Sequence, residues 1–262
     1  MKNRPLKRVF IIFLVLVCAS TQGFSIDFRN QLPSTKLIKY KHWHLEQNKT
    51  TGYTIIRIKT THKAGKKYFL EVSQNLDLEK KIFSEKKNWF DFQTGLLVSS
   101  SETDYRTGIS ILNHITATDL VTEVTDGDEH LKLSLEMEEG LVPFAVLPLY
   151  LQKSIQELRE KRRLTFMLYL PAVAIELKRK GLPISFSKFE IAVSIVGESK
   201  IKTPLGVKSA IRILLTPTSL LVNSILPKEK TAFHFTYMTD PPNLLLEFEE
   251  NQTRSTLETY QP

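Results

Sequence analysis

The sequence predicts a mainly β protein: a curved antiparallel sheet or half-barrel, with one inserted amphipathic helix packed on its concave face. Apolar and polar residues alternate with period two along most of the chain, which is typical of half-buried strands. Short turn-rich segments separate these runs, as at Thr125-Asp-Gly-Asp-Glu129, and favour hairpins. One stretch, residues 148–162, has the spacing of a helix instead.

Residues 1–25 have the order of a secretory signal peptide. Four basic residues precede the apolar run 9–17, and small residues follow it up to Gly23 and Ser25. The run is shorter than the roughly 18 residues that a membrane span needs. We therefore expect cleavage after Gly23 or Ser25, no stable transmembrane anchor in the mature chain, and a periplasmic or otherwise exported location. A retained anchor is one alternative. A lipoprotein acylated at Cys18 is another, although Val17 stands where a bacterial lipobox has a small residue.

The composition is that of a globular chain, with 42% hydrophobic and 24% charged residues. Cys18 is the single cysteine, so the mature chain would have no disulfide and no thiolate metal site, which favours a bacterial envelope. The formal net charge is +8, and local clusters of lysine, such as those in 80–87, could meet anionic lipid or polysaccharide. Solvated loops explain such clusters more simply. The export signal argues against a nucleic-acid partner.

Residues 26–250 are expected to form a single antiparallel β domain, because no Pro/Gly/Ser-rich linker divides them. Strands are predicted, in order, at 53–58, 68–73, 96–100, 108–116, 120–125, 131–137, 164–170, 174–177, 189–196, 207–214, 232–237 and 244–249. Residues 251–262 are polar, and we expect them to be a frayed tail.

The predicted helix begins at Pro148, a residue suited to a first helical turn. Leu151, Ile155 and Leu158 recur at helical spacing, and the basic residues 161–163 stand where cations favour the helix dipole. We expect the apolar stripe to pack on the sheet. A membrane-surface helix is the alternative, but such a helix is usually basic along its whole polar face.

Two turns are predicted between the strands that end near residue 196 and begin near residue 207. The first lies at 197–199 and the second at Thr203-Pro-Leu-Gly206. Pro204 removes a ladder donor, and Gly206 allows backbone angles closed to other residues. We expect this second turn to help the sheet curl back on itself.

These segments, taken in order, resemble a family. They are similar to a bacterial family of exported proteins of unknown function. The similarity lies in the order of Phe189-Glu-Ile-Ala-Val-Ser-Ile-Val-Gly-Glu-Ser, Thr203-Pro-Leu-Gly206, an apolar segment at 219–226, a strand at 233–237, an Asp-Pro turn and a strand at 246–249. Residues 90–95 and the helix at Pro148 follow the family's order. That family is similar in fold to the lipoprotein-carrier (Lol-type) half-barrels, which implies a curved sheet around a helix. It has no settled catalytic residues, so the resemblance assigns none.

Candidate catalytic groups are few. His42 and His44 share one face of a strand, a spacing that could hold a metal, but no third ligand is identifiable. Asp126, Asp128 and Glu129 lack the spaced oxygen ligands of a calcium loop. Neither a Gly-x-Ser-x-Gly elbow nor a phosphate-binding Gly-rich loop with its lysine occurs. The sequence predicts no catalytic residue, metal or cofactor, and it favours binding over catalysis.

Two main function classes stay open. In the first, the protein is a carrier whose partner is a hydrophobic ligand: a lipid, an acyl chain or a lipoprotein. In the second, it is a structural or adaptor protein that binds an envelope protein through its sheet edges. Hydrolysis at a histidine or metal site is a third alternative. The predicted ligand-binding residues are large apolar side chains: Leu151, Ile155, Phe189, Ile191, Phe233 and Phe235.

Overall fold

The computed structural model describes residues 26–32, 37–116, 118–138, 140–179, 181–183, 187–218, 233–250 and 252–262. The predicted signal peptide and the apolar segment 219–226 lie outside these ranges. Within them, none of the helices has the length and apolar character required to cross a bilayer.

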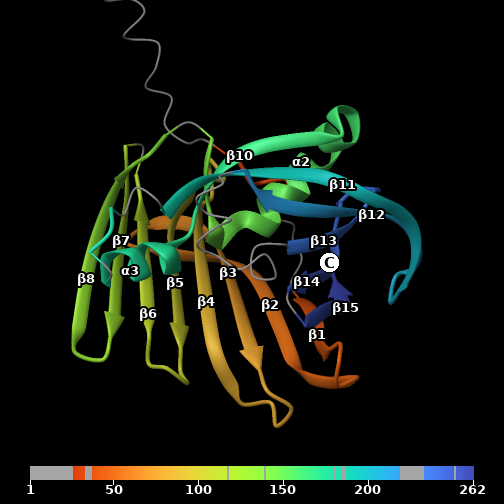
Figure 1. Cartoon of the computed structure of the whole chain (residues 1–262), viewed down its shortest axis with the longest axis horizontal. Helices are drawn as coiled ribbons and strands as arrows, with labels where there is room; N and C mark the ends of the chain where they lie inside the picture. The colour runs from red at the N-terminus through yellow and green to blue at the C-terminus, as the bar shows by residue number, and fades with distance from the viewer. Residues whose placement is uncertain are drawn as a thin grey trace, which may run out of the picture.

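A single large sheet dominates the described chain (Figure 1). Its strands are β1 (Leu37–His44), β2 (Lys49–Lys63), β3 (Lys66–Leu76), β4 (Ile82–Asp91), β5 (Leu97–Asp104), β6 (Ser110–Ile115), β7 (Asp119–Asp126), β8 (Glu129–Glu136), β9 (Leu141–Pro143), β10 (Arg163–Tyr169), β11 (Lys188–Thr203), β12 (Gly206–Pro217), β13 (Phe233–Met238), β14 (Leu245–Glu250) and β15 (Thr253–Gln261). Their spatial order is β8-β7-β6-β5-β4-β3-β2-β1-β15-β14-β13-β12-β11-β10-β9. Neighbours are antiparallel except β9 and β10. The predicted mainly antiparallel β fold is confirmed.

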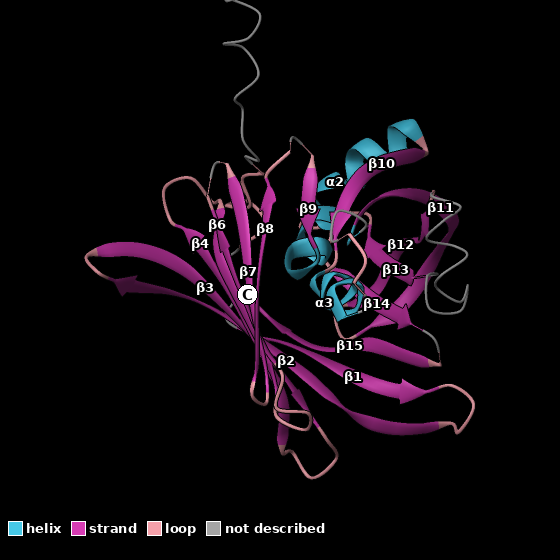
Figure 2. Cartoon of the chain, turned by 60° about the vertical axis from the view of Figure 1, so that its left-hand side comes forward, coloured by secondary structure: helices cyan, strands magenta, loops and turns pink. Residues whose placement is uncertain are grey.

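The sheet curls strongly, so its two ends approach each other (Figure 2). β8 and β9 are consecutive in sequence, yet they stand at opposite ends of the strand order. A buried cluster contains Leu120 and Leu133 from one end and Leu141 and Tyr169 from the other. The Tyr169 hydroxyl also lies 2.8 Å from Thr122 Oγ1. The sheet is therefore a half-barrel whose ends meet along an apolar seam.

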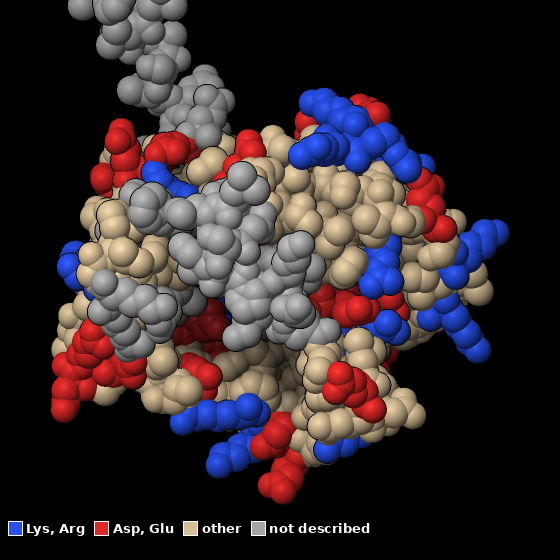
Figure 3. Space-filling view, in the orientation of Figure 1, with Lys and Arg blue, Asp and Glu red and all other residues tan. Residues whose placement is uncertain are grey.

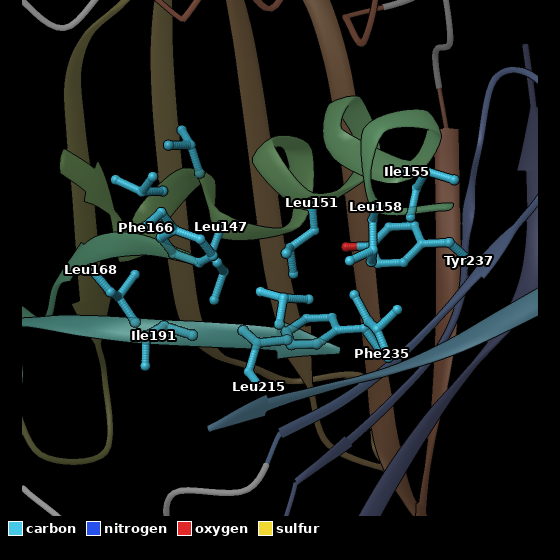
Figure 4. Close-up of a cluster of buried hydrophobic side chains, with 14 of the residues drawn as sticks. Leu147, Leu151, Ile155, Leu158, Phe166, Leu168, Ile191, Leu215, Phe235 and Tyr237 are labelled. Atoms are coloured by element: carbon cyan, nitrogen blue, oxygen red, sulfur yellow. The ribbon is translucent and has the colours of Figure 1, made fainter. Parts of the chain in front are cut away.

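The predicted helix is confirmed as α2 (Leu147–Lys161), which follows the short helix η1 (Phe144–Val146). Leu151, Ile155 and Leu158 are buried and face side chains of β11, β12 and β13 (Figure 4). Side chains of β4 and β5 belong to the same buried cluster, so the helix lies inside the curve of the sheet (Figure 2). The Tyr237 hydroxyl donates to the Pro148 carbonyl at 2.9 Å and fixes the start of the helix.

The prediction of a strand at 174–177 is wrong, because these residues belong to the helix α3 (Pro171–Arg179). The amides of Val173 and Ala174 both donate to the Leu170 carbonyl, which starts a helical turn just after β10. Ala174, Ile175 and Leu177 are buried, and Ala174 belongs to the buried cluster with Leu120 and Tyr169 at the seam between the sheet ends. A short apolar run fits a strand or a buried helix equally well by periodicity.

The prediction of a frayed tail is also wrong. β15 lies between β1 and β14, inside the sheet, and pairs with β1 from Leu37↔Gln261 to His44↔Thr253. Ser255 and Leu257 are buried at alternate positions. The tail is polar in sequence, and one of its two buried residues is a serine, but β14 and β1 supply ladder partners on its two sides.

Of the two predicted turns, that at 203–206 is confirmed and that at 197–199 is wrong. Thr203 Oγ1 accepts from the Leu205 amide at 3.1 Å and donates to the Gly206 carbonyl at 2.9 Å, where Gly206 has φ +89°. Residues 197–199 instead continue β11, with a register shift between Ile195 and Gly197. Such a bulge bends a strand without ending it.

Candidate ligand-binding site

A cavity of about 710 Å³ lies between the start of α2 and the concave face of the sheet. Its apolar lining comes from η1, α2 and strands of the C-terminal half: Phe144, Leu147, Pro148, Phe235, Leu245 and Phe248. Small polar side chains of β1 to β4 and β15 line it as well, including Thr54, Ser73, Asn75, Ser84 and Ser255. Tyr40, Ile56 and Phe83 add apolar surface on these strands, so one wall of the cavity is apolar and the other is mixed, with most of the polar groups.

Side-chain size explains why space remains there. The apolar stripe of α2 packs against large residues of β10 to β13, such as Phe166, Ile191 and Phe235. Many residues that line the cavity on the facing strands are serine, threonine and asparagine, whose short side chains leave space beside the start of the helix. Gly52 also lines the cavity, and a Cβ there would lie 2.2 Å from the Leu76 carbonyl oxygen. Only glycine therefore allows β2 to pass so close to the end of β3.

The polar wall is a hydrogen-bonded ladder across five adjacent strands. His42 Nδ1 lies 2.6 Å from Ser255 Oγ, and His42 Nε2 lies 2.7 Å from Thr54 Oγ1. Thr54 Oγ1 donates to Asn75 Oδ1, and Asn75 Nδ2 donates to Ser84 Oγ at 2.7 Å. Because the threonine proton goes to Asn75, Thr54 Oγ1 accepts the proton of His42 Nε2, and in the neutral ring Nδ1 accepts from the Ser255 hydroxyl. His42 is then neutral, in agreement with a pKa that burial lowers.

Charged groups stand at the ends of this ladder. Lys86 Nζ donates to the Ala145 carbonyl at 3.3 Å, and the Arg106 guanidinium stacks on the Phe83 ring at 3.5 Å. Both cations line the cavity on the β4–β5 side. Glu250 lines it on the β14 side, and burial raises the pKa of its carboxyl. Glu102 stands opposite Lys86 across β4 and β5 and also lines the cavity, so the β4–β5 side carries two cations and one carboxylate.

A smaller chamber of about 100 Å³ adjoins the cavity and shares Ser73 and Lys86 with it. Glu71, which is 7% exposed, lines this chamber and accepts from Asn88 Nδ2 at 2.8 Å. Burial raises the pKa of Glu71, although Lys86 and the hydrogen bond from Asn88 act in the opposite direction. The carboxyl is thus biased toward its neutral form, which suits an apolar surrounding.

The structure brings the six predicted ligand-binding residues together, mostly as packed interior. Leu151, Ile155, Phe189, Ile191 and Phe235 belong to one buried cluster, and Phe233 packs against it. Of the six, Phe235 lines the cavity. Their role in ligand binding stays a prediction. Sequence reasoning missed the polar ladder, although small polar residues at inward positions of consecutive strands were a usable signal.

The two histidines considered for a metal site have protein partners. Both ring nitrogens of His42 are engaged in the ladder, and His44 Nδ1 accepts from the Gln47 amide at 3.3 Å. Across the residues that the structure describes, no group of three or more His, Cys, Asp or Glu side chains is placed to hold a metal ion.

No protein-family model matches the sequence, and no curated protein matches it. Among solved structures, a β-barrel-like protein of domain of unknown function DUF1849 from Brucella abortus is similar over 87% of this chain and 97% of its own, with a TM-score of 0.48 and 7% identity. A protein from Bacteroides fragilis NCTC 9343, named as exported with a YmcC-like fold, is similar over 93% of this chain and 100% of its own, with a TM-score of 0.33 and 12% identity. Similarity at this level carries no functional argument, and the resemblance to Lol-type carriers stays a prediction.

Proposed function

We propose that this protein is a non-catalytic carrier that holds a lipid, or another amphipathic molecule with an acyl chain, between α2 and the concave face of its sheet. The cavity of about 710 Å³ carries the proposal, because small-molecule sites are typically concave, largely apolar and about 300 to 1,000 Å³ in volume. The predicted signal peptide at 1–25 supports a periplasmic location for this role.

The two walls suggest how such a ligand lies. An acyl chain would contact Phe144, Leu147 and Phe248, where removal of apolar area from water contributes roughly 25 cal/mol per Å². Lys86 and Arg106 line the same cavity beside Glu102, and the net positive charge of these three side chains suits an anionic head group, such as a carboxylate or phosphate. This arrangement uses no catalytic residue, metal or cofactor.

The second candidate is the adaptor that binds an envelope protein through a sheet edge. Its supporting observation is that β8 ends the strand order and, within the described chain, pairs only with β7. However, the exposed residues of β8 include Glu129, His130, Lys132 and Glu136, and charged side chains on an edge strand oppose pairing with another chain. We therefore prefer the carrier.

Displacement of a fluorescent fatty acid by unlabelled fatty acid tests the carrier. We expect saturable binding at micromolar probe and weaker binding by Ser73→Trp, since Ser73 lines both the cavity and the smaller chamber. For Ser73→Trp we expect a loss of affinity of about tenfold, which corresponds to 1.4 kcal/mol of binding free energy. Gln74→Trp is the matched control, because Gln74 is the next residue of β3 and bonds to Arg57 and Glu85 on the other face.

Thr51→Trp is a second variant. Thr51 is exposed and lines the cavity, so a bulky residue there should weaken ligand binding without disturbing the packing of the buried core. Circular dichroism should show that all three variants are folded. No saturable binding by delipidated protein, or equal affinity in the cavity variants and Gln74→Trp, would overturn the proposal.

A further inference from the structure

The outer part of the β11–β12 hairpin projects from the sheet as a two-stranded ribbon, residues 196–209, which we call the arm. β11 pairs with β10 only from Lys188 to Ser194, and β12 pairs with β13 from Ala210 to Leu215. In the described chain, residues 197–203 and 206–208 form ladder pairs only within the hairpin. Figure 1 shows the arm curving away at the right of the molecule. It is therefore accessible along both edges.

The arm has two unlike faces. Ile201 and Leu205 pack against a buried cluster that includes Ala210, so their face is turned toward the molecule. Lys202 pairs with Val207 across the ribbon, which places them together on the opposite face. Glu198 and Lys200 share that side of β11 with Lys202, and Val196 precedes them at the register shift next to Gly197. Val207 is 66% exposed and Val196 is 50% exposed. The outer face thus presents Val207 beside Lys200 and Lys202, and the exposed Val196 beside Glu198.

The basic end of α2 continues this outer face. Arg162 Nη1 lies 2.8 Å from Glu198 Oε1 and so ties the helix end to the arm. Residues 157–163 and 196–209 together contain seven basic and three acidic side chains. Figure 3 shows Lys and Arg gathered along the upper right and right of the molecule, over these elements. Within the described residues, no ion pair engages Lys200, Lys202 or Lys208.

We propose that the outer face of the arm and the basic end of α2 dock on a membrane of anionic phospholipid. The valines would enter the interface, where apolar side chains leave water, and the lysines and arginines would meet the head groups. Charge alone would also suit an acidic polysaccharide or protein. The exposed valines favour a membrane, because an apolar residue contributes little to binding a hydrated polyanion. This surface is separate from the cavity and does not depend on the proposed carrier function.

Flotation with vesicles tests the docking surface. The protein should float with vesicles of equimolar phosphatidylglycerol and phosphatidylcholine, and not with vesicles of phosphatidylcholine alone. Lys200→Glu with Lys202→Glu should weaken this binding at least about thirtyfold, since each basic residue near an anionic surface contributes about 1 kcal/mol. Lys59→Glu with Lys66→Glu makes the same charge change on exposed residues of β2 and β3 and should bind nearly as the wild type does.

Val207→Ser separates a membrane from a soluble polyanion. It should weaken vesicle binding and leave any binding to dextran sulfate unchanged. Ser73→Trp should float as the wild type does, so failure of the carrier and failure of the docking surface are distinguishable. Absence of binding to anionic vesicles, an equal loss in the Lys59/Lys66 control, or full vesicle binding by Val207→Ser would overturn the proposal.

Discussion

Replacing Ile155 with alanine should destabilise the protein strongly, because this side chain is 0% exposed and lies in the main buried cluster. Truncation of a fully buried isoleucine to alanine typically costs 2 to 5 kcal/mol, from lost transfer free energy and from the cavity left behind, so we expect about 3 kcal/mol. For a chain of this size each kcal/mol lowers Tm by about 2 to 4 °C. The expected decrease in Tm is roughly 6 to 12 °C.

Urea unfolding measures this cost directly. Trp43 and Trp89 lie on β1 and β4, so their fluorescence reports the sheet, while far-ultraviolet circular dichroism reports both sheet and helix. The two signals should give the same midpoint if unfolding is two-state. Ile155→Ala should lower the midpoint at an unchanged slope, since the surface exposed on unfolding hardly changes.

Gln156→Ala is the matched control, because Gln156 is the next residue of α2 and is exposed. We expect this variant to stay within about 0.5 kcal/mol of the wild type. Ile155→Asp should cost several kcal/mol, as expected for an unpaired buried charge. If Ile155→Ala or Ile155→Asp unfolds at the midpoint of Gln156→Ala, the stripe of α2 is not packed on the sheet, and the membrane-surface alternative for this helix returns.

Two further predictions concern β15 and Glu71. A chain that ends at Glu250 should fail to unfold cooperatively, because β1 and β14 both lose a ladder partner. Removal of Gln261 and Pro262 alone is the control and should change the stability little. A cooperative unfolding transition in the chain that ends at Glu250 would contradict the topology. Burial raises the pKa of Glu71 above its ordinary 4.5, so the wild type loses stability as pH rises from about 4.5 through the folded-state pKa. The unfolding free energy of Glu71→Gln should therefore improve relative to the wild type as pH rises from about 4.5, and a difference that is flat with pH would refute this reasoning.

Local periodicity predicted the elements that depend on local sequence. Alternation located β2, β3 and β5 to β8 of the N-terminal meander but missed β4 (Ile82–Asp91), and the spacing of Leu151, Ile155 and Leu158 located α2. The C-terminal strand forms a local hairpin with β14, but it was missed because its sequence is polar and one of its two buried residues is Ser255. Its other partner, β1, lies more than 200 residues away, and no local pattern reports so distant a pairing. The residues of α3 were assigned to a strand because a short apolar run has no decisive period, although Pro171 was a helix-start signal.

The candidate site was harder to predict than the fold. Large apolar residues such as Phe189 and Ile191 were chosen as ligand contacts, but α2 covers them because large side chains pack most closely against a helix. The cavity remains where inward residues are small and polar, as at Thr54 and Ser84. Alternation indicates which residues point inward. It does not indicate which of them a helix covers, because that depends on the curvature of the sheet and the position of α2.

Photolabelling with a diazirine fatty acid, followed by peptide mass mapping, tests the carrier function most directly. If the ligand lies between α2 and the concave face, label should appear in peptides that contain Phe144 and Leu147 or Leu245 and Phe248, which line the cavity. Excess unlabelled fatty acid should remove it. Label confined to peptides outside the cavity lining, or label that unlabelled fatty acid does not displace, would contradict the proposal that this cavity binds an acyl chain.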